Sequence, residues 1–225
     1  MKKAWMSWSS GKDSAFALYE LSRQPDIRTV GLLTTVNETH ERVAMHAVRD
    51  ELLARQADEL GLPLHRVKIP HGCSDELYAS RMREAVAAAV KAGVTHMAFG
   101  DLFLEDIKTY RETMLASTPI QPLFPLWKRP TQDLAIEMIA AGQKAIITCV
   151  DPKKLPAHFA GREFDRSFLA DLPPGVDPCG ENGEFHSFVY DSPGFKRAIP
   201  VRVGEVVGRE GFVFADLKIS STAGA

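Results

Sequence analysis

The chain has 225 residues, of which 45% are hydrophobic and 25% are charged, with 27 Lys and Arg against 29 Asp and Glu. This composition is typical of a folded globular protein and excludes a disordered chain, a collagen-like chain and a coiled coil. The near-neutral balance gives no general attraction to nucleic acid, so nucleic acid is not an expected partner. No apolar run reaches the ~20 residues of a membrane-spanning helix, and Lys12 and Asp13 interrupt the basic N-terminus before a secretion signal can form. We therefore expect a cytoplasmic protein with no membrane partner.

Apolar segments of strand character alternate with segments of helical periodicity from the N-terminus to about residue 150. The expected strands are Lys3–Trp8, Arg28–Val36, Leu64–Ile69, Val94–Gly100 and Ala145–Val150, and the expected helices are Ser14–Arg23, His46–Leu60, Asp75–Ala92 and Thr131–Ala141. Strands that are apolar throughout and separated by helices predict a parallel sheet covered on both faces. Residues 1–155 are therefore predicted to form a doubly wound, Rossmann-like α/β domain.

Beyond residue 150 the chain is rich in proline, glycine and charge, with one short helical stretch at Glu163–Leu172. Alternating patterns then predict strands at Phe185–Tyr190, Ile199–Val207 and Phe212–Ile219, and Gly208–Gly211 is a hairpin connection between the last two. Residues 156–225 are therefore expected to form a small C-terminal α+β unit with antiparallel strands. We expect it to pack on the first domain.

The most informative segment reads WSSGKDS, from Trp8 to Ser14, and lies between the first strand and the first helix. Its small residues let consecutive backbone N–H groups point to one place, and the helix adds its positive N-terminal end, so the segment predicts a phosphate-binding loop. The expected phosphate contacts are Ser9, Ser10, Gly11, Lys12, Asp13 and Ser14. Asp13 would repel a phosphate directly, so it either holds a Mg²⁺ ion that bridges phosphates or caps the helix. The segment matches neither the P-loop nor the dinucleotide fingerprint.

The sequence SSGKDS resembles the pyrophosphate loop of the N-type ATP pyrophosphatases, and the whole chain resembles one branch of them, the diphthine–ammonia ligase family. Three further segments carry this resemblance: GDLFLEDIKTYRE (Gly100–Glu112), PLFPLW (Pro122–Trp127) and GENGEFHSFVYDSP (Gly180–Pro193). The resemblance implies the fold of the adenine nucleotide alpha-hydrolase-like superfamily. It also implies that ATP and Mg²⁺ are the cofactors, that residues 1–155 bind ATP and that residues 156–225 bind the acceptor of the reaction.

The resemblance further implies an ATP-dependent amide ligase. A substrate carboxylate would attack the α-phosphorus of ATP, release pyrophosphate and form an acyl-adenylate, from which ammonia would displace AMP. The acceptor of the family is a modified histidine on translation elongation factor 2, which implies a carboxylate-bearing acceptor that belongs to a protein. Ammonia would come from solution or from a partner. A homodimer is a possible assembly.

Further site residues follow from the resemblance. The additional nucleotide contacts are His46, Gly100 and Asp101, the acceptor contacts are Asp106, Arg111, Glu181, Gly183 and Glu184, and the catalytic residues are Lys12, Asp13, Arg111 and Glu184. Arg111 would neutralise the α-phosphate or orient the acceptor carboxylate. Glu181 and Glu184 would serve the acceptor end, because two close carboxylates suit an amine, an ammonium ion, a metal or a base. Without the resemblance, Gly100 is a strand end and the two glutamates are turn residues.

One residue departs from the family pattern. Ser10 stands where the family usually has the first of two glycines, and glycine permits a positive φ and a close approach of the backbone. A serine suits this position if its φ is negative, and its hydroxyl adds a donor. We expect nucleotide binding to survive the exchange.

Two other functions stay open. RNA base thiolation uses a related loop, but it normally needs a pair of reactive cysteines, for which Cys149 and Cys179 are the candidates. With Cys73 these make three widely spaced cysteines, which show no zinc-ligand spacing and no disulfide framework. The third function is that of a nucleotide-binding regulatory protein without transfer activity.

Overall fold

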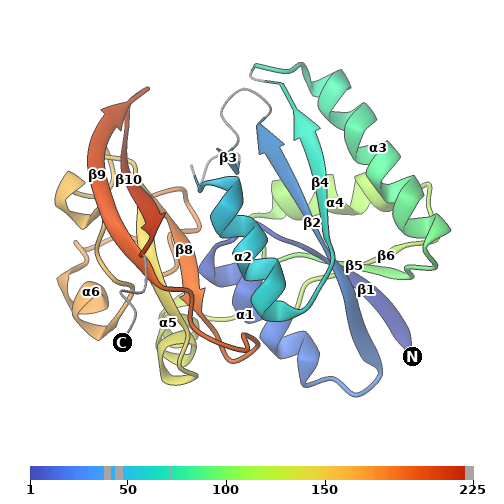
Figure 1. Cartoon of the computed structure of the whole chain (residues 1–225), viewed down its shortest axis with the longest axis horizontal. Helices are drawn as coiled ribbons and strands as arrows, with labels where there is room; N and C mark the ends of the chain where they lie inside the picture. The colour runs from blue at the N-terminus through green and yellow to red at the C-terminus, as the bar shows by residue number, and fades with distance from the viewer. Residues whose placement is uncertain (38–41, 44–47, 71, 221–225) are drawn as a thin grey trace.

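The computed structural model describes residues 1–37, 42–43, 48–70 and 72–220, and these residues form two sheets that lie side by side (Figure 1). The strands of the first sheet are β1 (Lys2–Ser7), β2 (Ile27–Asn37), β3 (Arg42–Val43), β4 (Leu64–Ile69), β5 (His96–Ala98) and β6 (Gln121–Leu123). Five of them are parallel in the order β4-β2-β1-β5-β6, and β3 pairs antiparallel with the end of β2. The order reverses between β1 and β5, so a doubly wound sheet places its binding crevice at the carboxyl ends of these two strands.

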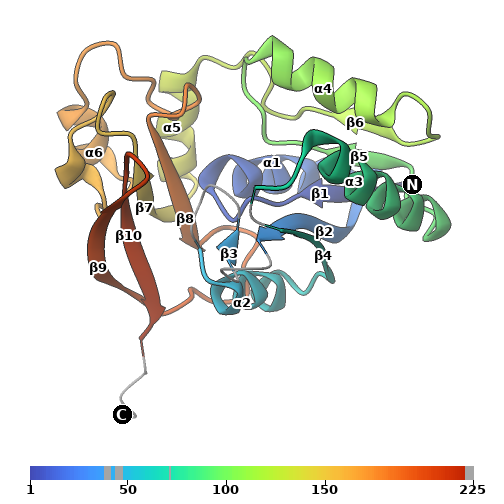
Figure 2. The same cartoon turned by 90° about the horizontal axis from the view of Figure 1, so that it is seen from above.

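Helices cover both faces of the parallel sheet (Figure 2). They are α1 (Lys12–Ser22), α2 (Asp50–Leu60), α3 (Asp75–Lys91) and α4 (Glu105–Leu115). Alternate residues of β1 belong to two different cores: Met6 packs with Phe16 of α1 and Leu52 of α2, whereas Trp5 packs with Val86 of α3 and Leu115 of α4. The predicted doubly wound, Rossmann-like α/β fold with an antiparallel C-terminal unit is confirmed.

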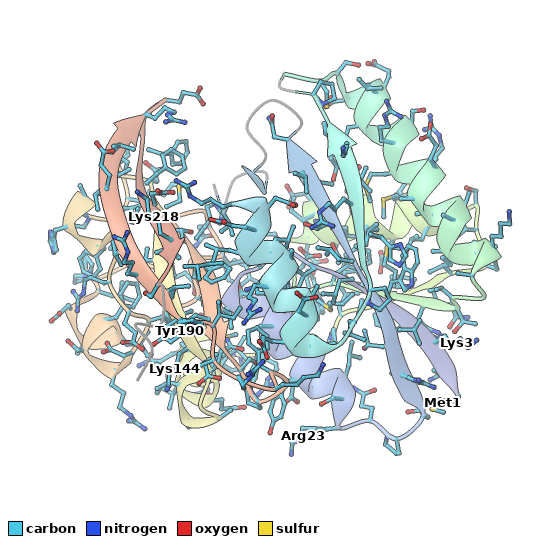
Figure 3. All side chains as sticks on the ribbon, viewed as in Figure 1. Met1, Lys3, Arg23, Lys144, Tyr190 and Lys218 are labelled. Atoms are coloured by element: carbon cyan, nitrogen blue, oxygen red, sulfur yellow. The ribbon has the colours of Figure 1, made fainter. Side chains whose placement is uncertain are left out.

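The second sheet is antiparallel, in the order β8-β7-β10-β9. Its elements are α5 (Thr131–Ala140), β7 (Lys144–Val150), η1 (Ala157–Phe159), α6 (Arg166–Asp171), β8 (Phe185–Asp191), β9 (Val201–Arg209) and β10 (Phe212–Ile219). Figure 3 shows Lys144 of β7 close to Tyr190 of β8, where the Lys144 ammonium pairs with the Asp191 carboxylate at 3.4 Å.

The strand at Ala145–Val150 was expected in the parallel sheet, and this expectation is wrong. The structure pairs β7 with β8 and β10, both antiparallel. Residues 145–150 are all buried, as in a strand of a parallel sheet, because β7 is an inner strand of the second sheet. A strand that is buried on both faces has the same continuous apolar pattern whether its sheet is parallel or antiparallel. The change of sheet therefore falls between β6 and β7, well before residue 155.

Element boundaries differ from the prediction in small ways. Helix α1 begins at Lys12, directly after the glycine of the loop, and α2 begins at Asp50. The short strand β6 was not predicted, because its three residues are a glutamine, a proline and a single leucine, a pattern that does not indicate a strand. None of the helices in the described residues has the length and apolar character needed to cross a membrane.

The first sheet with α1 to α4 is the first unit, and the second sheet with α5, η1 and α6 is the second unit. The two units share one hydrophobic core and several polar contacts. One buried cluster joins Phe16 of α1 and Leu52 of α2 to Phe188 of β8. Hydrogen bonds cross the same junction, including Gln56 Nε2 to the carbonyl of Val189 at 2.6 Å. A core that is continuous between two units favours unfolding in one cooperative step.

We therefore expect a single unfolding transition. Trp5 and Trp8 report on the first sheet by fluorescence, whereas far-ultraviolet circular dichroism reports on both units. The two probes should give coincident urea curves. Gln56→Ala removes three buried hydrogen bonds at the junction and should lower both midpoints together. Two separate midpoints in the wild-type protein would show that the units fold independently.

Candidate functional site

The loop between β1 and α1 lies at the point where the strand order reverses. Gly11 precedes α1 in an extended conformation, with φ −90° and ψ 172°, and as a glycine it has no side chain to cap the helix. The N–H groups of the first turn of a helix have no partner within the helix, and the helix dipole makes this end positive. The loop therefore has the geometry of an anion-binding helix N-terminus.

The backbone of this loop is held by α2 and by β8 of the second unit. The carbonyl of Ser10 accepts hydrogen bonds from Gln56 Nε2 at 3.0 Å and from the backbone N–H of Val189 in β8 at 3.0 Å. The backbone N–H of Lys12 donates to Ser187 Oγ of β8 at 3.2 Å. The loop is thus fixed by a strand that lies far away in the sequence.

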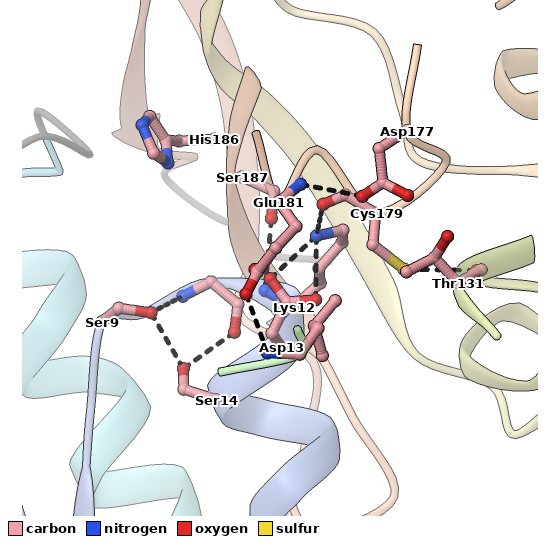
Figure 4. Close-up of polar contacts among 12 residues, drawn as sticks. Ser9, Lys12, Asp13, Ser14, Thr131, Asp177, Cys179, Glu181, His186 and Ser187 are labelled. Atoms are coloured by element: carbon pink, nitrogen blue, oxygen red, sulfur yellow. Dashed lines mark hydrogen bonds and ion pairs between the residues drawn. The ribbon is translucent and has the colours of Figure 1, made fainter. Parts of the chain in front are cut away.

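The hydroxyls expected to contact phosphate are tied to one another (Figure 4). Ser9 Oγ donates to Ser14 Oγ at 3.1 Å, and Ser14 Oγ donates to the carbonyl of Gly11 at 2.9 Å. Ser14 is buried, and Ser9 is half-buried. These bonds order the loop, and a phosphate contact with either hydroxyl remains a prediction.

Ser10 has a positive φ of 68°, so the condition set for a serine at this position is not met. Its side chain is fully buried, and Oγ has no hydrogen-bond partner among the described residues. A left-handed conformation costs a non-glycine residue of the order of 1–2 kcal/mol. A glycine would avoid this cost, so this chain carries strain at Ser10.

Lys12 points into the junction between the two units. Its Nζ donates to both carboxylate oxygens of Asp13, at 2.9 and 2.8 Å, and to the backbone carbonyl of Cys179. It also lies 5.7 Å from the ring centre of Phe164 and 5.3 Å from that of Phe185, and the side chain is only 3% exposed. Burial lowers the pKa of Lys12, but the Asp13 carboxylate together with other nearby groups such as Glu181 raises it, and the net shift is upward.

Asp13 is the more accessible member of this pair, with 27% of its side chain exposed. Burial raises its pKa, and the charge of Lys12 opposes the rise. Among the described residues, no group of three or more His, Cys, Asp or Glu side chains is arranged to hold a metal ion. Mg²⁺ at nucleotide sites is usually held by one or two carboxylates together with phosphates, and Asp13 fits that donor set only with a nucleotide bound.

Glu181 reaches from the second unit to the end of β5. Its Oε1 accepts a hydrogen bond from the backbone N–H of Leu102 at 2.8 Å, and its own N–H donates to Asp177 Oδ2 at 2.8 Å. Burial raises the pKa of Glu181 to about 7, and the nearby Asp13 carboxylate adds to the rise. The structure thus brings Glu181 next to the Lys12–Asp13 pair (Figure 4).

Glu184 lies in the same turn but points into it. Its Oε1 accepts from the backbone N–H of Asp177 at 3.1 Å and from Asn182 Nδ2 at 3.2 Å, and the residue is 4% exposed. Gly183 has a φ of +80°, which the turn requires. These contacts indicate that Glu184 and Gly183 shape the turn that presents Glu181.

Asp101 and Arg111 face each other beyond β5. Arg111 Nε lies 3.5 Å from Asp101 Oδ2, and neither atom has a well-aligned hydrogen bond. The guanidinium also packs over the ring of Phe99 at 5.1 Å. Burial raises the pKa of Asp101, and Arg111 opposes the rise. By contrast, Asp106 is exposed in the first turn of α4.

The structure shows a reason for glycine at position 100 that is neither a nucleotide contact nor the end of a strand. A Cβ atom at this position would lie 2.9 Å from the backbone carbon of Asp13 and 2.9 Å from the nitrogen of Ser14. The missing side chain therefore lets the first turn of α1 approach the end of β5. A nucleotide contact at Gly100 remains a prediction.

The cysteines do not resemble reactive thiols. Cys149 is buried in β7, and burial raises its pKa to about 12. Burial also raises the pKa of Cys179, whose Sγ donates to the carbonyl of Thr131 at 3.4 Å. Reactive cysteines have lowered pKa values and some exposure, so these two side chains lack both properties.

His46 lies outside the described residues, so its predicted contact cannot be placed. Two supporting residues were missed by sequence reasoning. Gln56 occupies the apolar face of α2, three residues after Leu53, and its position on that face was the available signal. Gln143, whose Nε2 donates to the carbonyl of Lys12 at 2.9 Å, carries no such signal.

The fold and the loop define a doubly wound α/β protein with a serine- and glycine-rich loop at the switch point of its parallel sheet. The family model described as diphthamide synthase N-terminal domain matches residues 1–118, and the model described as diphthamide synthase C-terminal domain matches residues 130–220. The chain belongs to the diphthamide synthase family, which confirms the resemblance found in the sequence.

Several similar proteins are named diphthine–ammonia ligase. The protein of Bos taurus is 37% identical over 118 residues and that of Homo sapiens 36% over 118 residues, each match covering 50% of this chain and 44% of the relative. The matched part thus spans under half the length of these mammalian relatives. The protein of Danio rerio is 29% identical over 242 residues, covering 92% of this chain and 89% of the relative.

A solved structure also shows a distant likeness. It is the U34-tRNA thiolase NcsA from Methanococcus maripaludis with its [4Fe-4S] cluster, at 15% identity and a TM-score of 0.40, covering 62% of this chain and 57% of that one. A likeness at this level supports no inference about this chain.

Ser10→Gly is expected to stabilise the protein. The exchange relieves the positive φ and removes a buried hydroxyl without a described partner, so the free energy of unfolding should rise by about 1 kcal/mol. Urea unfolding measures the change. Ser80→Gly in the middle of α3 is the control and should destabilise by about 0.5–1 kcal/mol. Loss of stability in Ser10→Gly would contradict the strain at Ser10.

Gly100→Ala is expected to destabilise the protein by about 1–3 kcal/mol, because the added methyl group meets the backbone of α1. Gly208→Ala is the matched control, since no atom lies within 4 Å of its added Cβ, and it should change the free energy of unfolding by less than about 0.5 kcal/mol. Equal effects in the two variants would show that Gly100 is not needed for the approach of α1.

Proposed function

We propose that this chain is an ATP-dependent ligase that converts the carboxylate of an acceptor into an amide with ammonia, as the name of its relatives suggests. One observation supports this proposal most strongly. The phosphate-type loop of the first unit and the Glu181 turn of the second meet at one place, through the Glu181–Leu102 and Lys12–Cys179 hydrogen bonds. A ligase needs its nucleotide end and its acceptor end at such a junction.

In the proposed reaction the loop binds the phosphates that leave as pyrophosphate. The positive N-terminal end of α1 stabilises the negative charge that develops there. Lys12 acts through Asp13, because its ammonium is buried against that carboxylate and offsets its charge. Mg²⁺ would neutralise the phosphates, with Asp13 as the candidate carboxylate ligand.

Arg111 is the residue that we assign to the carboxylate of the acceptor. It lies beyond the carboxyl end of β5, near the crevice that the strand order defines, and it carries a fixed positive charge. Its contact with Asp101 is long and poorly aligned, so the guanidinium can turn toward an incoming carboxylate. The acceptor would then stand between Arg111 and the α-phosphate.

The thiolation alternative gains no support from the buried cysteines with raised pKa values. The regulatory alternative differs from the ligase in outcome. A regulator binds ATP without cleaving it, whereas the ligase forms AMP and pyrophosphate only when acceptor and ammonia are present.

The test uses ATP, Mg²⁺, an ammonium salt and elongation factor 2 that carries diphthine. Mass spectrometry of the acceptor should show exchange of a carboxylate for an amide, with one AMP per amide. Arg111→Met should lower kcat/KM for the acceptor at least tenfold, equivalent to about 1.4 kcal/mol, and change the Kd for ATP less than threefold.

Arg83→Met, which replaces an exposed arginine of α3, is the matched control and should leave both values unchanged. ATP binding without AMP formation would favour the regulatory protein. Transfer of sulfur to RNA would favour thiolation. A loss of ATP affinity in Arg111→Met as large as the loss in kcat/KM would remove Arg111 from the acceptor end.

A further inference from the structure

The nitrogen source of the proposed ligase poses a chemical requirement. Dissolved ammonia is almost wholly ammonium at neutral pH, and ammonium has no lone pair with which to attack a carbonyl. A ligase that takes ammonia from solution therefore needs a group that binds the cation and accepts one proton. Such a group must be an unprotonated base beside the reacting carbon, with a pKa near the working pH.

Three of the carboxylates near the loop are paired or buried. Both oxygens of Asp13 accept from Lys12, and Asp101 faces Arg111. Glu184 is 4% exposed: its Oε1 accepts two hydrogen bonds inside its own turn, and its Oε2 is buried without a partner among the described residues. Glu181 differs from these. Its Oε1 accepts from the N–H of Leu102, and among the described residues no side chain donates to its Oε2.

We propose that Glu181 binds the incoming ammonium ion and accepts its proton, so that neutral ammonia attacks the acyl-adenylate. This inference rests on the proposed ligase function and assigns the ammonia site within it. The Leu102 N–H fixes one carboxylate oxygen at the end of β5, and the other oxygen is left for the cation. Glu181 is then a catalytic residue that touches the substrate nitrogen.

The charges around Glu181 suit a cation. The negative groups near it are Asp13 from α1, Asp101 after β5 and Asp177, which accepts from its backbone N–H. The opposing positive groups are Lys12 and Arg111, which pair with Asp13 and Asp101. Burial, with the two aspartates, raises the pKa of Glu181 to about 7, so the group can both accept and release a proton near neutral pH.

The nitrogen loses two protons in this step, one to Glu181 and one to water. One proton passes from ammonium to the Glu181 carboxylate and leaves ammonia and a neutral carboxylic acid. The nitrogen lone pair forms the C–N bond at the acyl carbon, and the C–O bond to AMP breaks with its electron pair on the AMP phosphate. The nitrogen loses a second proton to water, and Glu181 returns its proton to water.

Hydroxylamine separates this role from a structural one, because it is mostly uncharged at neutral pH and attacks acyl-adenylates without prior deprotonation. Glu181→Gln keeps the acceptor for the Leu102 N–H but cannot take a proton. In this variant kcat/KM for ammonium at pH 7 should fall at least tenfold. Hydroxamate formation from hydroxylamine, and acceptor-dependent ATP–pyrophosphate exchange, should stay within threefold of wild type.

The pH profile gives a second readout. Above pH 7 the wild-type rate at fixed total ammonium should level off, because Glu181 is deprotonated there, and it should fall as the pH drops through 7 and the carboxylate protonates. The Glu181→Gln rate should instead rise about tenfold per pH unit, in proportion to free ammonia. Glu51→Gln, an exposed glutamate of α2, is the control and should behave as wild type.

Glu181→Ala with added formate guards against a folding defect, since formate should restore ammonium use if the pocket is intact. Equal losses with ammonium and hydroxylamine would show a structural role and overturn the proposal. Unchanged use of ammonium in Glu181→Gln would also overturn it. Wild-type protein that forms no amide with either nucleophile would instead refute the ligase function itself.

Discussion

The backbone carbonyls of Ser10 and Lys12 need hydrogen-bond partners, and the rest of this structure depends on how these partners are supplied. The need arises because a buried backbone group without a partner destabilises the fold. Gln56 and the N–H of Val189 satisfy the carbonyl of Ser10, and Gln143 satisfies that of Lys12. Since Val189 and Gln143 belong to the second unit, the loop has its observed shape only when the two units are docked.

A buried charge strengthens the same junction. Lys12 lies between the rings of Phe164 and Phe185 and reaches the carbonyl of Cys179, so a cation from the first unit is enclosed by the second. Such a group is tolerated only because Asp13 pairs with it, and removal of one partner of a buried pair commonly costs about 3–5 kcal/mol. Exchange of Lys12 would therefore alter the fold as well as any phosphate contact.

Much of the fold could be predicted because its signals are local. The strand β4 and the loop at Ser9–Ser14 follow from apolar runs and from small residues placed between a strand and a helix. The sheet of β7, the direction of Lys12 and the different orientations of Glu181 and Glu184 depend on contacts between distant segments. No periodicity encodes such contacts, and the φ of Ser10 is likewise set by its bonds to Gln56 and Val189.

The glutamate turn shows why the two units of this fold belong together. Glu181 needs the N–H of Leu102 from the first unit to fix its carboxylate, and Glu184 needs Asp177 and Asn182 of the second to hold the turn. The raised pKa of Glu181 is also a product of docking, because burial and the charge of Asp13 cause it. Either unit alone would leave a solvated glutamate with an ordinary pKa and a loop without its supports. The acid–base property at this junction is therefore created by the same contacts that assemble the phosphate-type loop.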